Sequence, residues 1–204
     1  MFTENEVDAL ILNDEIKQAI QDLRSDFLKE EAAYLEIDDH DFLALTILTP
    51  SVGISLSNGS VSLFEEISLN KKARKLSKGG YFMKKDPVVV AMGFLIKHYD
   101  QWQDKFYGFL KFLMEQTFDR TSMLESKIDR PEVSEADLCR EGLKTPFIFI
   151  RFLTSFFLDD EEEDIAQKRN ISKAELSRIN EIGEKIGFDE IPLFRKFMTN
   201  FIVR

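Results

Sequence analysis

The segment that decides the fold spans residues 86–118 and reads DPVVVAMGFLIKHYDQWQDKFYGFLKFLMEQTF. Asp86 is a favourable helix N-cap, and Pro87 suits the first helical position, where its missing N–H breaks no hydrogen bond. From there, large apolar side chains recur at alternating steps of four and three residues, at Val88, Met92, Leu95, Tyr99, Trp102, Phe106, Phe109 and Leu113. This heptad spacing predicts one long central helix over about residues 86–118, with a length of about 45 Å.

Two aromatic residues of this segment, Phe94 and Tyr107, fall outside the heptad stripe. The first half of the segment is apolar on all sides, which predicts that other helices surround it. Phe94 and Tyr107 are therefore expected to make apolar contacts with further helices or with a partner.

Capping boxes predict helix starts elsewhere in the chain. In this motif an N-cap hydroxyl accepts the N–H of the third residue on, whose carboxylate accepts the N-cap N–H in return. Thr3, Ser62 and Ser172 are each followed by a glutamate at that spacing. Together with the three-four spacing of apolar residues between Leu12 and Phe27, these motifs predict a mostly α fold, a single-domain bundle of helices around the long one.

One stretch, residues 52–63 with the sequence VGISLSNGSVSL, shows period two instead. Apolar residues alternate with glycine or serine on both sides of Asn58-Gly59, a dipeptide that favours the two-residue turn of a β-hairpin. Pro50 is expected to end the preceding helix. A short β-hairpin over residues 52–63 therefore competes with helical structure there.

Residues 146–158 read PFIFIRFLTSFFL and form the longest apolar run of the chain. Its length and its start at Thr145-Pro146 favour a helix over a buried strand. The sequence leaves open whether this helix packs in the core or faces a partner.

The 204-residue chain carries 37 acidic and 27 basic residues, for a net charge of −10, and includes 19 phenylalanines. This length suits one domain over residues 1–204, with a division near residues 121–133 left open. The sequence shows no secretory signal and no membrane span, and its single cysteine, Cys139, permits no internal disulfide. A cytoplasmic location is therefore expected.

Only two histidines, His40 and His98, are available for catalysis or metal binding. His40-Asp41 resembles the His-Asp pair of metal-dependent phosphohydrolases, but that family also needs an upstream histidine, which this chain lacks. The run from Asp38 to Asp41 is therefore interpreted as a solvated helix start, whose carboxylates accept from backbone N–H groups. No catalytic, cofactor or metal site is predicted, and the sequence points away from an enzyme.

Charge is unevenly distributed along the chain. Residues 1–60 hold 13 acidic and 3 basic residues, whereas residues 61–120 hold 7 acidic and 11 basic ones. Basic and aromatic residues of this second third form the candidate interaction patch, Lys71, Lys72, Arg74, Lys75, Lys78, Tyr81, Phe82, Lys84 and Lys85. Such a patch can bind an acidic partner. The alternative interpretation is a helix C-terminus whose lysines match the helix dipole and face the chain's own acidic N-terminal helix.

These patterns predict a soluble, non-enzymatic helical protein that acts through protein–protein contacts, as a regulator, adaptor or assembly component, with another protein or as a homo-oligomer. A first alternative is an all-α pocket protein that holds an apolar or aromatic small molecule between its helices. A second alternative is binding of phosphates or nucleic acid by the basic patch, which the overall negative charge disfavours.

Overall fold

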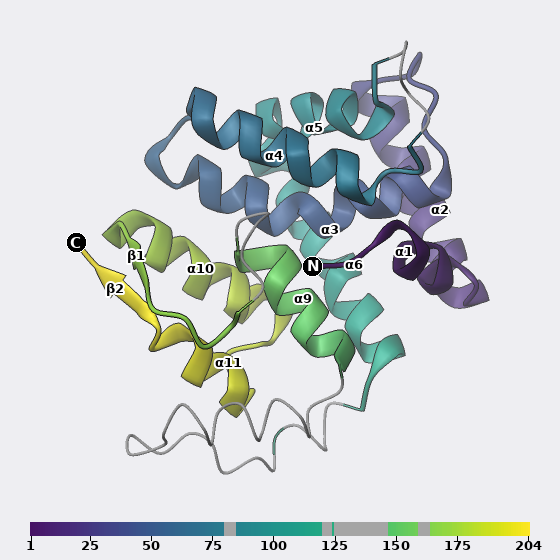
Figure 1. Ribbon diagram of the computed structural model, residues 1–204. Coiled ribbons are helices and arrows are strands. Elements are labelled where there is room, and N and C mark those ends of the chain that lie inside the picture. The colour runs from purple at the N-terminus through teal and green to yellow at the C-terminus, as the bar shows by residue number, and fades with distance from the viewer. Residues whose placement is uncertain (80–84, 120–123, 125–146, 159–163) are drawn as a thin grey trace.

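The computed structural model describes residues 1–79, 85–119, 124, 147–158 and 164–204, and helices dominate this part of the chain (Figure 1). The predicted mostly α fold is confirmed. In chain order the elements are α1 (Glu4–Ile11), α2 (Asp14–Glu31), α3 (Asp39–Ser55), η1 (Leu56–Asn58), α4 (Leu63–Leu76), α5 (Pro87–Lys97), α6 (Tyr99–Thr117), α9 (Phe147–Phe157), β1 (Arg169–Ile171), α10 (Lys173–Ile186), α11 (Pro192–Met198) and β2 (Phe201–Val203). Their buried apolar side chains form one continuous core. Most of residues 121–133 lie outside the described part of the chain, so a division there stays a prediction.

Helix α3 is the centre of the fold. Nearly all of its residues are buried, and it contacts α1, α2, α4, α5, α6, α9 and α10. Asp38 begins the helix by accepting the Asp41 N–H at 2.9 Å. The helix continues through Pro50, so the expectation that Pro50 ends it is wrong. An interior proline costs about 3 kcal/mol. Burial of Leu48 and Val52 on either side of it outweighs that cost.

The β-hairpin expected over residues 52–63 does not form. α3 runs to Ser55, η1 follows, and Gly59, with a positive φ of 87°, turns the chain toward the capping box at Ser62. The period-two pattern wrongly indicated strands because, near the end of α3, apolar and polar side chains are both buried. Val52 lies in the core, while the Ser51 hydroxyl faces the carbonyl oxygens of residues 155 and 156 at 3.1 and 3.2 Å. Contacts on all sides of the helix therefore override period two.

The single long helix expected over residues 86–118 is two helices, α5 and α6, which meet at His98 and run in different directions (Figure 1). His98 leaves helical geometry, with φ −118° and ψ 27°, and its Nδ1 lies 3.3 Å from a carboxylate oxygen of Glu31. The two helices then meet different neighbours: α5 packs on α3 and α4, whereas α6 packs on α2, α3 and α10. Heptad spacing does not reveal this break because the apolar stripe continues across it.

The C-terminal elements complete the core around α9. Phe149, Phe152 and Phe156 of α9 are fully buried, and the helix packs against α3, so most of this phenylalanine-rich segment belongs to the core, although Phe147 at its start is exposed. Strands β1 and β2 pair in parallel, with Arg169 opposite Phe201. The sequence did not predict these strands because three residues are too few to establish a period of two.

Candidate functional site

Helix α4 lies over α3 and is held to the rest of the molecule along one side (Figure 1). Its capping box at Ser62 begins the helix, with the Glu65 carboxylate accepting the Ser62 N–H at 2.7 Å. Leu69, Ala73 and Leu76 are buried and lie on one half of the helix at 100° per residue. This anchored half fixes which residues of α4 face outward.

The opposite half of α4 carries six exposed residues, which we call the outer face: Leu63, Phe64, Ile67, Lys71, Arg74 and Lys75. Its first turns are apolar, and its last turns are basic. Leu63, Phe64 and Ile67 are 69%, 85% and 47% exposed, respectively. Because residues three and four positions apart are neighbours on a helix, Ile67 adjoins both Leu63 and Phe64, and the three side chains form one apolar patch rather than scattered exposed residues.

The outer face contains no acidic residue. Glu65 turns back to cap the helix, and Glu66 falls outside the half-turn that the six residues share. Sequence reasoning found the cations of this face but missed its apolar end. The buried series at residues 69, 73 and 76 carries the missing signal, because its phase places residues 63, 64 and 67 outside.

The structure supports only part of the candidate interaction patch as a surface. Lys71, Arg74, Lys75, Lys78 and Lys85 are exposed. Tyr81, Phe82 and Lys84 lie outside the described residues, so the aromatic part of the patch stays a prediction.

Lys72 does not belong to the surface. Its side chain is on the buried half of α4, with the residue only 4% exposed, and its Nζ donates to Ser51 Oγ at 2.9 Å. Ser51 in turn faces the last carbonyl groups of α9. The ammonium therefore lies near the negative end of the α9 dipole, which favours a cation at that position.

Just after the end of α4, Lys78 forms an ion pair with the start of α3. Lys78 Nζ lies 2.9 Å from Asp38 Oδ2, and the Lys78 N–H donates to Asp41 Oδ1 at 3.0 Å. The hydrogen bond to Asp38 raises the pKa of Lys78. Burial acts to raise the pKa of Asp38, but hydrogen bonds from the Asp41 N–H and the Lys78 ammonium outweigh it, and the pKa is lowered. Lys78 thus pairs with the chain's own acidic N-terminal third.

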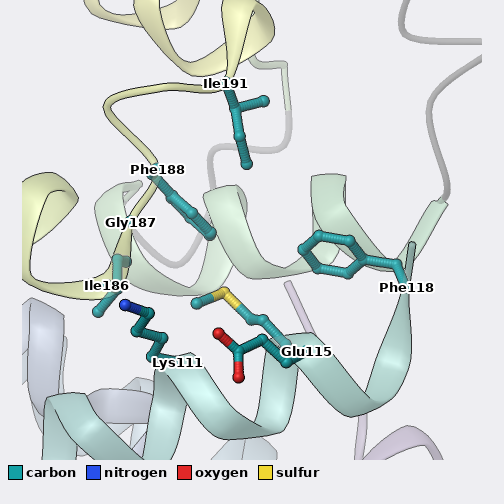
Figure 2. A pocket seen from close by; sticks show the side chains of 8 residues that line it. Lys111, Glu115, Phe118, Ile186, Gly187, Phe188 and Ile191 are labelled. Carbon is teal, nitrogen blue, oxygen red and sulfur yellow. The ribbon is translucent and has the colours of Figure 1, made fainter. Parts of the chain in front are cut away.

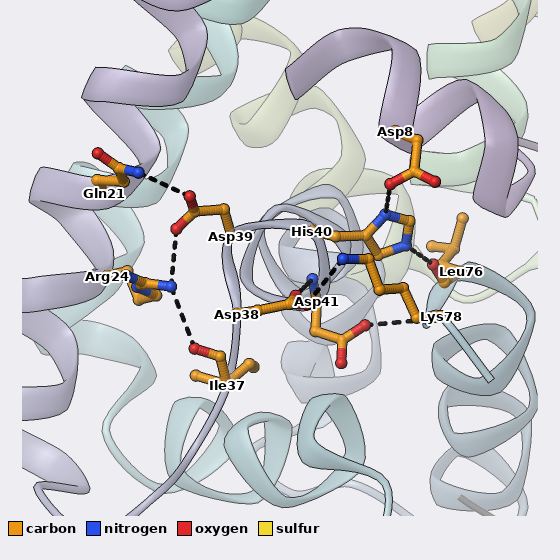
Figure 3. Close-up of polar contacts among 10 residues, drawn as sticks. All are labelled: Asp8, Gln21, Arg24, Ile37, Asp38, Asp39, His40, Asp41, Leu76 and Lys78. Atoms are coloured by element: carbon orange, nitrogen blue, oxygen red, sulfur yellow. Dashed lines mark hydrogen bonds and ion pairs between the residues drawn. The ribbon is translucent and has the colours of Figure 1, made fainter. Parts of the chain in front are cut away.

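His40 joins three helices at this same point (Figure 3). Its Nδ1 lies 2.7 Å from Asp8 Oδ1 on α1, and its Nε2 lies 2.8 Å from the Leu76 carbonyl oxygen at the end of α4. Each ring nitrogen of His40 therefore faces an oxygen atom of a different helix. Asp38 is exposed and caps the helix as expected, whereas His40 and Asp41 are 2% and 1% exposed, so only part of this helix start is solvated. Among the described residues, no three potential metal ligands gather here or elsewhere.

Of the two aromatic residues outside the heptad stripe, Tyr107 of α6 reaches α3, and Phe94 of α5 contacts the turn that follows α2. The Tyr107 hydroxyl forms a short hydrogen bond with that of Tyr99 beside Gly53 of α3. Phe94 packs edge-on against Tyr34, with ring centroids 6.3 Å apart. Burial raises the pKa of Tyr99 to about 12 and that of Tyr107 well above its usual value. Tyr107 is therefore a core residue and offers no surface to a partner.

Two depressions in the described part of the molecule differ in their capacity to hold a ligand. A pocket lined mainly by apolar residues, with Lys111 and Glu115 also in its lining, has a volume of about 10 Å³ (Figure 2). Sites for drug-sized ligands measure roughly 300–1,000 Å³, so this pocket is too small for one.

The second depression is an open groove of about 540 Å³ between α1, α2 and the start of α3, lined in part by Leu12 and Lys17. Its acidic groups already have partners: Asp8 contacts His40, Asp38 contacts Lys78 and Asp39 contacts Arg24. The outer face of α4 is therefore the stronger candidate for function.

Comparison with known proteins adds no constraint, because no family model, curated protein or solved structure matches this chain. Within the described ranges, no helix has the length and apolar character needed to cross a bilayer.

Proposed function

We propose that this protein acts through protein–protein contacts, as a regulator, adaptor or assembly component, and that the outer face of α4 is its docking surface. The observation that carries the proposal is the exposed apolar patch of Leu63, Phe64 and Ile67 on a helix whose other side is firmly packed. Exposed apolar residues that adjoin one another mark interaction sites, whereas single ones are common on any surface.

The free energy gained by burying the apolar patch can be compared with the cost of association. Burial of three large apolar side chains is worth roughly 5–9 kcal/mol in total. Association itself costs about 4–15 kcal/mol, so the apolar patch alone gives weak binding at best. The neighbouring cations Lys71, Arg74 and Lys75 lie where they can add attraction and select the partner.

Photo-cross-linking in cells that naturally express the protein tests this function. A benzophenone side chain replaces Phe64 in one variant and the exposed Phe147 at the start of α9 in a control variant. We expect position 64 to give one discrete protein adduct, identified by mass spectrometry, and position 147 to give none of the same mass. The adduct should disappear with Ile67→Glu, which changes the outer face, but persist with Ile202→Glu, which does not. Ile202 is a matched control because the two isoleucines are similarly exposed, 47% and 46%.

Two outcomes would contradict the proposal. The first is an adduct that forms equally at positions 64 and 147, or that persists when Ile67→Glu is introduced. The second is a purified monomer that carries a stoichiometric apolar molecule in native mass spectrometry, which would favour the pocket-protein alternative.

A further inference from the structure

We infer that the segment docking on α4 is an acidic amphipathic helix, an inference that rests on the proposed function and names the partner's chemistry. The outer face contains a stripe at Phe64, Ile67, Lys71 and Arg74, which follow one another at steps of three, four and three. Steps of this kind form the contact line of helices that pack side by side in a coiled-coil manner. A second helix can therefore lie along α4 over about 15 Å, the rise from residue 64 to residue 74.

The chemistry of the stripe changes along its length. Phe64 and Ile67 need apolar partners, whereas Lys71 and Arg74 at the following contact positions need acceptors of negative charge. Lys75 lies beside them on the same face and extends the basic end. A complementary helix has large apolar residues at two successive contact positions and Glu or Asp at the next two. Like charges there would be repelled, which makes the basic end a determinant of specificity.

A protein helix fits this surface better than a lipid bilayer. Helices that lie in a membrane interface carry an apolar face along their whole length, with cations on the polar face. On α4 the apolar and basic residues share one face and are separated along the axis, so only one end could enter a bilayer. The chain's net charge of −10 also opposes approach to an anionic membrane.

Helical peptides of defined chemistry test the inference with the full chain, by fluorescence anisotropy. One peptide carries two leucines and then two glutamates along its contact stripe. A second has the same composition with leucine and glutamate alternating along the stripe, and a third replaces the glutamates by lysine. We expect the first to bind at least about tenfold more tightly than the second, and the third not to bind. Added salt should weaken the binding.

A charge exchange makes the test specific to α4. Lys71→Glu with Arg74→Glu should abolish binding of the glutamate peptide and create binding of the lysine peptide. A matched control, Lys29→Glu with Lys173→Glu, alters exposed lysines on other helices and should leave both results unchanged. Equal binding of the segregated and alternating peptides would overturn the inference, as would a charge exchange that leaves peptide preference unaltered.

Vesicles of phosphatidylserine and phosphatidylcholine provide the third arm. Vesicle binding that Phe64→Ser and Lys71→Glu each weaken, without any peptide binding, would assign the surface to membranes and overturn the inference. Loss of peptide preference while the cross-link at position 64 persists would refute the acidic helix alone. Loss of the cross-link would remove the proposed function as well.

Discussion

Gly53 lies where the hydroxyl groups of Tyr99 and Tyr107 meet in the core. A Cβ atom at this position would lie 2.8 Å from Tyr107 Oη and nearer still to Tyr99 Oη. Both oxygens belong to large, buried rings on α6, so neither can move aside easily. The absence of a side chain at Gly53 therefore allows α3 and α6 to approach.

Gly53→Ala is expected to lower the free energy of unfolding by about 1–3 kcal/mol, because the added methyl overpacks this contact. Gly108→Ala on α6 is the matched control, since its Cβ would meet nothing within 4 Å. That control should raise stability by about 0.5–1 kcal/mol, the usual gain for alanine in a helix interior. Urea unfolding at neutral pH measures both, and a Gly53→Ala variant as stable as the parent would refute the packing argument.

The same tyrosine pair predicts a loss of stability at high pH. The pKa of Tyr99 is about 12 in the folded chain. Its value in an unfolded chain is about 10. Below pH ~10 the Tyr99 hydroxyl keeps its proton in both the folded and the unfolded state, and its contribution to the free energy of unfolding is fully present. Between pH ~10 and ~12 only the unfolded state ionises, so stability falls by roughly 3 kcal/mol from Tyr99 alone.

A variant with Tyr99→Phe and Tyr107→Phe separates the effect of tyrosine ionisation from that of lysine titration, because the parent and the variant contain the same lysines. The difference in unfolding free energy between parent and variant should shrink or reverse in favour of the variant as pH rises from ~10 to ~12. A difference that stays constant across that window would contradict the assignment.

At the scale of elements, Lys72 links three helices, since it leaves α4, donates to Ser51 of α3 and lies near the end of α9. Lys72→Ala should cost about 1–3 kcal/mol, because the Ser51 hydroxyl and the α9 carbonyls lose their cation. Lys71→Ala, one residue away but exposed, should change stability by less than about 0.5 kcal/mol. Thermal unfolding of the two variants makes the comparison. Equal effects would show that the buried ammonium contributes nothing particular.

Helix starts were predictable from the sequence because their causes are local. The capping boxes at Thr3, Ser62 and Ser172 all form, since each needs only four adjacent residues. The continuation through Pro50 and the break at His98 were not predictable, because both depend on which helices surround those residues. The candidate site shows the same division: cations on α4 were identified from the sequence, but the burial of Lys72 depends on its neighbours in the fold.

At the scale of the whole molecule, the buried residues of the N-terminal and C-terminal helices belong to one core. The chain has one tryptophan, Trp102, which is fully buried. The Trp102 indole N–H donates to a carboxylate oxygen of Glu31 at 2.7 Å. The indole therefore reports on the packing of α6 against α2.

We expect a single cooperative unfolding transition, because a continuous core couples the loss of one helix to the loss of the others. Trp102 fluorescence and far-ultraviolet circular dichroism should give coincident denaturant midpoints. Phe152→Ala in α9 should shift both midpoints together by the same amount, although Phe152 lies far from Trp102 in sequence. Two separated transitions would instead support a division of the chain near residues 121–133.

The hydrogen bonds of His40 offer a way to observe docking from a distance. They connect the last turn of α4 to α1 through Leu76 and Asp8, so we expect a displacement of the end of α4 on docking to shift α1 as well. Leu12, directly after α1, is 83% exposed and lies off the outer face. An environment-sensitive dye at position 12 would therefore act as a remote sensor, reading occupancy of α4 without touching the surface that a partner covers.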